Sequence, residues 1–84
     1  MIFSIDYDKQ PREFLRKLDK HISKRILDKI DTLKENPVPQ NIKAIVGQHG
    51  VFRIRIGDYR ALYRINYQGN KIIIIKIDKR PRIY

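Results

Sequence analysis

The sequence predicts one small α+β domain, in which a pair of helices covers one face of a largely antiparallel sheet. Apolar and polar residues alternate near the N-terminus and again after residue 50, which is the period of a half-buried strand. Between these stretches the apolar residues recur at helical spacing. The element order is therefore β-α-α-β-β-β, and the 84 residues are enough for only one domain, spanning residues 1–84.

The first strand is predicted over residues 2–7, and a short helix follows it. The apolar side of this strand is formed by Phe3, Ile5 and Tyr7. Asp8 is of a residue type that caps helices, and Pro11 is tolerated in a first turn, where it removes no intrahelical hydrogen bond. The helix should pack through its apolar residues, which are Phe14, Leu15 and Leu18.

A second helix is predicted from about residue 20 to residue 35, and Pro37 ends it because the residue before a proline disfavours helical backbone. Its apolar stripe consists of Ile22, Ile26, Ile30 and Leu33. Residues 38–50 contain proline and glycine and are expected to form a connector. Three further strands are predicted at residues 51–56, 59–67 and 71–79.

The turn Gly57-Asp58 fixes which residues share a face of the first hairpin. A two-residue loop places Ile56 opposite Tyr59 and Arg55 opposite Arg60. The helix-facing side then receives Phe52, Ile54, Ile56, Tyr59, Ala61, Tyr63 and Ile65. The opposite side receives Arg53, Arg55, Arg60, Leu62 and Arg64.

The second turn, at residues 68–70, leaves two registers open, and a slip of one residue would turn the whole last strand over. A three-residue loop directs Ile73, Ile75 and Ile77 to the core. It directs Lys76, Asp78 and Arg80 to the arginine side. A two-residue loop would bury Lys76 and Arg80 without evident partners, which is costly, so the three-residue loop is favoured. Tyr59, Tyr63 and Tyr67 would then be structural residues on the core side.

The positive charge is concentrated in the last third of the chain. The formal net charge is +10, and nine of the 19 Lys and Arg residues lie in residues 53–84, which hold only two Asp. Like charges opposed across strands are destabilising unless an anion neutralises them, so a polyanionic partner is expected. There is no cysteine, no run long enough to cross a membrane and no metal-ligand pattern, so neither a cofactor nor a metal is expected and the compartment is taken to be the cytoplasm.

Several segments resemble the RelE/ParE toxin superfamily. The run Phe-Arg-Ile-Arg-Ile-Gly-Asp-Tyr-Arg-Ala-Leu-Tyr-Arg-Ile at residues 52–65 is similar to its central signature. The ending Asp-Lys-Arg-Pro-Arg-Ile-Tyr at residues 78–84 resembles its C-terminal segment, and Leu-Lys-Glu-Asn-Pro at residues 33–37 is also typical. Two positions depart from the pattern: many relatives have His where Lys79 stands, and Pro81 replaces the second Arg of the tail.

The resemblance implies a RelE-like fold and the activity of a type II toxin that cleaves messenger RNA on the ribosome and so inhibits translation. Carried over by position, the catalytic residues would be Arg53, Arg55, Arg60, Arg80 and Tyr84. The RNA-binding residues would be Arg64, Lys76, Lys79 and Arg82. The resemblance also implies a RelB-like antitoxin, with two toxins joined to an antitoxin dimer as a heterotetramer. Ile72 and Ile74, expected to be exposed on the charged side, and the helix-pair surface are candidate contacts for an acidic helical segment of that antitoxin.

Metal-independent cleavage uses the ribose 2′-hydroxyl as the nucleophile, and fixed guanidinium groups suit the charge of the phosphorane. This role is assigned to Arg60 and Arg80. His21 and His49 lie on the helix side and in the connector, so they are interpreted as surface residues. Proton transfer would then depend on Arg53, Arg55, Lys79 or Tyr84, and on orientation of the substrate by the ribosome. Tyr84 has two open roles, stacking on a nucleobase or packing at the terminus.

Three other functions fit the same pattern. A ParE-like toxin that inhibits gyrase would use this fold without a convergent Arg, Lys and Tyr site. A non-catalytic basic module would bind bare RNA with a steep dependence on salt. An inactive relative would retain the fold alone.

Overall fold

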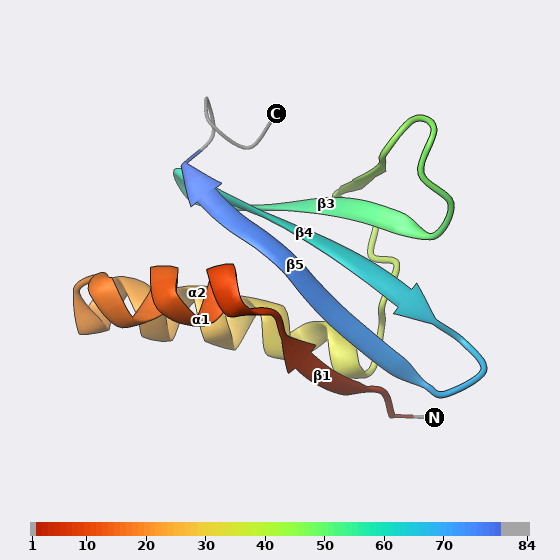
Figure 1. Ribbon diagram of the computed structural model, residues 1–84, viewed down its shortest axis with the longest axis horizontal. Helices are drawn as coiled ribbons and strands as arrows, with labels where there is room; N and C mark the ends of the chain where they lie inside the picture. The colour runs from red at the N-terminus through yellow and green to blue at the C-terminus, as the bar shows by residue number, and fades with distance from the viewer. Residues whose placement is uncertain (1, 80–84) are drawn as a thin grey trace.

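Two helices pack on one face of a five-stranded sheet in the computed structural model, which describes residues 2–79 (Figure 1). The strand order is β1-β5-β4-β3-β2. Strand β1 runs parallel to β5, and all other neighbours are antiparallel. The elements are β1 Ser4–Tyr7, α1 Lys9–Lys17, α2 Lys20–Asp31, the 3-10 helix η1 Thr32–Lys34, β2 Ile42–Ala44, β3 Val51–Ile56, β4 Tyr59–Asn66 and β5 Lys71–Lys79.

Both helices begin at an aspartate, but only the second aspartate caps with its side chain. Asp19 accepts a hydrogen bond from the backbone N–H of His21 at 2.9 Å. Asp8 occupies the corresponding position of α1 without a side-chain cap, and Pro11 is buried in that first turn. The predicted second helix is correct in position, although its last turn tightens into η1 after Asp31.

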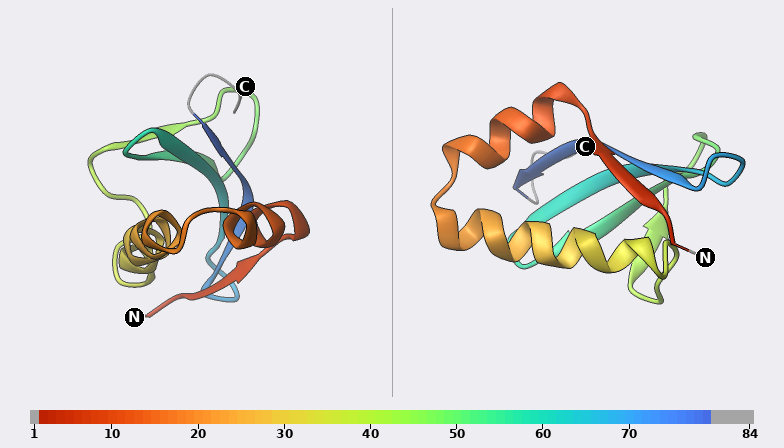
Figure 2. Two further views of the ribbon diagram at one scale, coloured as in Figure 1. Left: turned by 90° about the vertical axis from the view of Figure 1, so that its left-hand side faces the viewer. Right: turned by 90° about the horizontal axis from the view of Figure 1, so that it is seen from below.

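The core lies between the helix pair and the sheet, and Figure 2 shows α1 and α2 on the same side of the strands. Ile26 and Ile30 of α2 and Leu33 of η1 are fully buried, as the predicted stripe requires. They pack in one cluster with Tyr63 at the centre of β4. Burial of each such aliphatic side chain contributes roughly 1.5–3 kcal/mol to folding.

The first hairpin has the predicted register. Arg55 lies opposite Arg60, and Ile56 lies opposite Tyr59. Gly57 adopts a φ of 61°, a conformation that an L side chain rarely adopts. The turn therefore directs the arginines of β3 and β4 to the face that the helices do not cover.

The predicted register of the last strand is wrong in its first half. Four residues, 67–70, connect the paired positions Asn66 and Lys71, so Ile72 and Ile74 face the core and are fully buried. A β-bulge opposite Leu62 and Tyr63 then inserts Ile75 as an extra residue. The predicted core positions Ile73 and Ile75 are therefore only half-buried, on the other side.

The bulge explains why neither simple register was right. After it, Ile77 returns to the core at 0% exposure, while Lys76 pairs with Leu62 and Asp78 with Arg60. A run of four isoleucines can supply a core residue in either register, whereas Lys76 cannot be buried cheaply without a partner. One inserted residue buries Ile72, Ile74 and Ile77 and still keeps Lys76 outside.

Two other predictions also need correction. The connector contains the short strand β2, which pairs Lys43 with Arg53 and adds a fifth strand at the edge. Tyr67, expected on the core side, is 62% exposed, and its ring lies edge-on to Phe3 at a centroid distance of 5.9 Å. No helix within residues 2–79 has the length and apolarity needed to span a membrane.

Candidate nucleic-acid interface

The sheet face opposite the helices carries most of the basic side chains that the sequence singled out. We call this surface the basic face, and we define it by the described residues Lys43, Arg53, Arg55, Arg60, Arg64 and Lys76. It combines residues from four neighbouring strands, β2 to β5. No helix of the described residues covers it (Figure 2). Cross-strand partners lie side by side on one face, so the strand pairing determines which of these side chains are neighbours.

One row of the ladder centres on Leu62. Arg53 lies opposite Leu62 on one side, and Lys76 lies opposite it on the other. Lys43 extends the row because it pairs with Arg53. Arg53 and Lys76 therefore flank the half-buried side chain of Leu62, and Lys43 lies next to Arg53, an arrangement that can hold a phosphate near a base or ribose.

The next row centres on Arg60, which lies between Arg55 and Asp78. The pair Arg55–Arg60 opposes like charges directly, which costs stability, and Asp78 offsets part of that repulsion. Arg60 is half-buried and its Nε atom is buried, so its side chain is more constrained than an exposed arginine. A guanidinium held in this way can donate hydrogen bonds to an anion with little loss of side-chain entropy.

Two arginines of the basic face donate hydrogen bonds to backbone carbonyls. Arg55 Nε donates to the carbonyl of Gly57 at 3.2 Å, which holds its side chain at the hairpin turn. Arg64 Nη1 donates to the carbonyl of His49 at 3.2 Å. Arg64 lies four residues from Arg60 along β4, about 13 Å away at the usual strand rise, so it can contact a different part of a polyanion.

Of the remaining predicted site residues, only Lys79 lies within the described part of the chain, and it is not part of these rows. Lys79 lies opposite Tyr59, on the helix side of the alternation, with an exposed side chain. Arg80, Arg82 and Tyr84 lie outside the described residues. The structure therefore places Arg53, Arg55 and Arg60 on adjacent strands, and it leaves the tail positions as predictions.

One member of the basic face was missed in the sequence. Lys43 lies on β2, a three-residue strand within a stretch rich in proline and glycine. A strand that short gives almost no alternation to detect. The weak signal was the sequence Ile42-Lys43-Ala44, in which a single polar residue lies between two apolar ones.

The two histidines differ in their distance from the basic face. His21 is exposed at the start of α2, on the helix side. His49 is exposed in the loop before β3, and its backbone carbonyl contacts Arg64. Val51, the buried first residue of β3, follows this loop and lies opposite Arg64, so the loop borders one end of the basic face.

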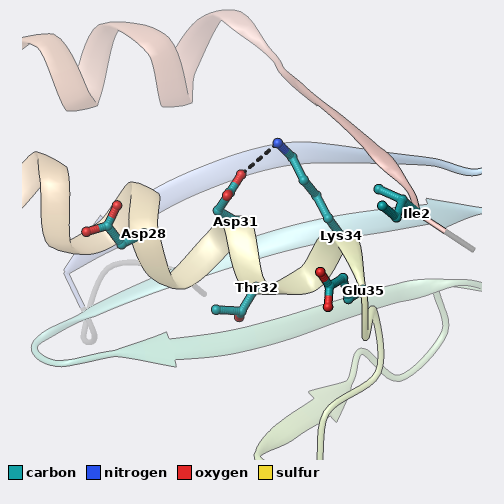
Figure 3. A pocket seen from close by; sticks show the side chains of 6 residues that line it. All are labelled: Ile2, Asp28, Asp31, Thr32, Lys34 and Glu35. Carbon is teal, nitrogen blue, oxygen red and sulfur yellow. Dashed lines mark ion pairs between the residues drawn. The ribbon is translucent and has the colours of Figure 1, made fainter.

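An acidic hollow lies elsewhere, around the end of α2 and η1 (Figure 3). Lys34 Nζ pairs with a carboxylate oxygen of Asp31 at 2.8 Å in this hollow. The hollow is lined by Ile2, Asp28, Asp31, Thr32, Lys34 and Glu35. Three carboxylates against one ammonium repel a polyanion, so RNA or DNA is disfavoured at this hollow and favoured on the basic face.

A comparison with protein families matches residues 5–84 to the ParE toxin of the type II toxin–antitoxin system parDE. The chain is 34% identical to RelE1 of Methanocaldococcus jannaschii over 100% of its own length and 97% of that protein. It is also 35% identical to toxin RelE3 of the same organism, over 83% of this chain and 82% of the relative.

Solved structures show the same architecture. The crystal structure of the archaeal RelE–RelB complex from Pyrococcus horikoshii matches with a TM-score of 0.84 and 31% identity, covering 98% of this chain and 99% of that one. The RelB–RelE antitoxin–toxin complex from Methanococcus jannaschii matches with a TM-score of 0.72 and 30% identity, covering 94% of each chain. The match confirms the predicted fold of two helices on an open, mostly antiparallel sheet.

Proposed function

Because the chain belongs to the RelE/ParE family of type II toxin–antitoxin toxins, we propose that it is an endoribonuclease that cleaves messenger RNA on the ribosome and thereby inhibits translation in the cytoplasm. One observation carries this proposal. Arg53, Arg55 and Arg60 lie on two adjacent strands of a face that is strongly basic and is covered by no described helix. An open basic face suits a long polyanionic substrate better than a small molecule, which needs a concave pocket.

The proposed reaction breaks one phosphodiester bond by an internal attack. The 2′-oxygen of the ribose loses its proton and bonds to phosphorus, and the bond from phosphorus to the 5′-oxygen breaks. The products are a 2′,3′-cyclic phosphate and a 5′-hydroxyl, which takes up the proton. Arg60 is proposed to stabilise the extra charge of the phosphorane, together with Arg80 of the tail.

Proton transfer is proposed to depend on four further groups. The candidates carried by this chain are Arg53, Arg55, Lys79 and Tyr84. His49 and His21 are not assigned a role in it, since neither lies in the two rows of the basic face. Arginine, lysine and tyrosine side chains are poor general bases at neutral pH. The ribosome is therefore proposed to orient the 2′-oxygen and to supply part of the catalytic geometry.

The RNA-binding residues of the proposal are Arg64, Lys76, Lys79 and Arg82, and the structure adds Lys43 to them as a candidate. We propose as partner an antitoxin related to RelB, because similar chains form RelE–RelB complexes. Ile72 and Ile74 cannot contact it, since both are fully buried. The half-buried Ile73 and Ile75 lie on the outer side of β5 and can accept an apolar residue of an acidic segment, in a complex of two toxins and an antitoxin dimer.

The variant Arg60→Ala tests the catalytic assignment. We expect the rate of message cleavage in a translating extract, followed by primer extension, to fall by about 10²–10³-fold, as for loss of one transition-state donor. The Tm should stay nearly the same, because the change also removes the repulsion with Arg55. Arg16→Ala, at an exposed position of α1, is the matched control and should cleave normally. Loss of folded protein in the Arg60 variant, or cleavage at the normal rate, would contradict the assignment.

A second candidate is inhibition of gyrase, which is favoured by the description of the matching family as ParE toxins. It predicts blocked DNA supercoiling by purified gyrase and intact messages in the extract. The nuclease proposal predicts the reverse pair of results, so the two assays together separate the candidates.

A further inference from the structure

A second basic surface lies around the edge of β3, in a shallow cleft between α2 and the first hairpin. It is lined by Arg25, Asp28, Lys29, Thr32, Asn41, Arg55, Ile56 and Gly57. Three of these residues are cations and one is an anion. The cleft is separate from the rows that cross the sheet, but it shares Arg55 with them.

The charge balance of the cleft is more positive than this count suggests. The carboxylate of Asp28 pairs with Lys24 Nζ at 2.8 Å, and Lys24 does not line the cleft. Within residues 2–79, by contrast, the charged groups of Arg25 and Lys29 have no ion pair and no hydrogen bond. Two cations are thus available beside an acid that already has an ion-pair partner outside the cleft.

The hairpin turn makes room for one of these cations. A Cβ at Gly57 would overlap the guanidinium of Arg25, so glycine at this position lets Arg25 lie directly over the turn. Arg55 approaches the same turn from β3, through its hydrogen bond to the carbonyl of Gly57. Two guanidinium groups therefore converge on one turn, and that of Arg55 is held there by its hydrogen bond.

The helix spacing adds two further groups. Lys29 follows Arg25 by four residues on α2, and Thr32, the first residue of η1, follows Lys29 by three, so the three residues line the same side of the cleft. Asn41, immediately before β2, contributes an amide that can donate to a phosphate or accept from a ribose hydroxyl. The hydroxyl of Thr32 already donates to the carbonyl of Lys29 at 2.6 Å, so the donors that the hollow offers are guanidinium, ammonium and amide groups. Such groups bind phosphate oxygens.

We propose that this cleft binds a backbone phosphate of RNA, as a second subsite connected to the basic face through Arg55. The inference rests on the proposed function, because an RNA chain that lies across Arg60 and leaves over the edge of β3 reaches the cleft next. The RNA can be the message itself or RNA of the ribosome, since both present the same phosphates.

Binding of a fluorescein-labelled oligouridylate, measured by anisotropy over a salt series, tests the subsite without any cleavage. Lys29→Gln should weaken binding several-fold. It should also reduce the slope of log affinity against log salt concentration by about 0.7, the value expected for one lost phosphate contact on a single strand. Lys29→Arg should retain affinity. The matched control is Lys17→Gln, because Lys17 is exposed on α1 and removes the same charge outside the cleft.

A second arm with vacant ribosomes distinguishes the two sources of RNA. A loss confined to oligouridylate assigns the cleft to the message, and a loss confined to ribosomes assigns it to ribosomal RNA. Equal affinities of Lys29→Gln and Lys17→Gln in both arms would overturn the subsite. Failure of the nuclease proposal would appear separately, as uncut messages with RNA affinity intact.

Discussion

Tyr63 connects the centre of the sheet to the end of the helical segment. Its ring is fully buried among the core residues, and its hydroxyl donates to the carbonyl of Pro37 at 2.7 Å. Burial raises the pKa of this hydroxyl well above its usual value, with a smaller contribution from Tyr67. The residue is therefore structural, as its place in the β4 alternation predicted.

Removal of only this hydroxyl should cost stability but not activity. We expect Tyr63→Phe to lower the free energy of unfolding by about 1 kcal/mol, because the carbonyl of Pro37 loses its partner. Tyr67→Phe, at a residue that is 62% exposed, should change it by almost nothing. Urea denaturation of both variants measures the difference. A loss of cleavage without a loss of stability in Tyr63→Phe would show that its role had been assigned wrongly.

Tyr7 gives the protein a dependence on alkaline pH. Burial raises its pKa from 10.0 to about 12, and the charge of Asp31 adds to the shift. The unfolded chain releases this proton near the ordinary value, whereas the folded chain retains it, so the contribution is full below pH 10.0 and is lost toward pH about 12. We expect the free energy of unfolding, measured by urea denaturation at several pH values in this window, to fall less steeply with pH for Tyr7→Phe than for the unaltered protein. The same slope against pH for both proteins would rule out the contribution of Tyr7.

At the level of the elements, β5 is held from both sides. Strand β1 pairs with it as far as Ile74, and beyond that point the side chain of Gln10 replaces the missing strand. Gln10 Nε2 donates to the carbonyl of Ile77 at 2.8 Å, and its Oε1 accepts from the N–H of Ile77 at 2.9 Å. This pair of bonds fixes β5 immediately after the bulge that turns Lys76 outward.

The change Gln10→Ala should therefore destabilise the protein by about 2 kcal/mol, because two backbone groups lose their partners. Gln40→Ala serves as the control, since Gln40 is exposed in the connector and makes no side-chain hydrogen bond within the described part of the chain. Thermal unfolding of both variants is the measurement. Equal Tm values would show that the bulge is held by the sheet alone.

The elements also show what the sequence can and cannot predict. The helices and the first hairpin followed from spacing and turn chemistry, because a two-residue loop leaves one register. The register of β5 did not follow, since four consecutive isoleucines satisfy the core in either register and a bulge has no clear sequence signal. The same limit concealed β2, and with it Lys43 of the basic face.

The candidate site was predictable where the ladder alone determines it. Arg53, Arg55 and Arg60 follow directly from the turn at Gly57, whereas Lys76 reaches the same side only because of the bulge. The cleft beside α2 was not predictable, since it depends on the way Arg25 packs over Gly57. Contacts between a helix and a turn that are 32 residues apart leave no periodic pattern in a sequence.

For the whole molecule, the separation of charge is the property that connects fold and function. The sheet presents cations on one face, and the acidic hollow lies around the end of α2 and η1. A polyanion is therefore guided to the basic face and away from the acidic hollow, and its affinity for the basic face should fall steeply with salt. Guidance alone does not cleave RNA, so the account depends on a substrate that the ribosome holds in a reactive geometry.

Primer extension on one defined message, incubated with the purified protein in the presence or absence of ribosomes, tests this dependence most directly. The account predicts new 5′ ends within the translated region when ribosomes are present, and an intact message when they are absent. A message that stays intact with ribosomes, or that is cut at the same positions without them, would contradict it.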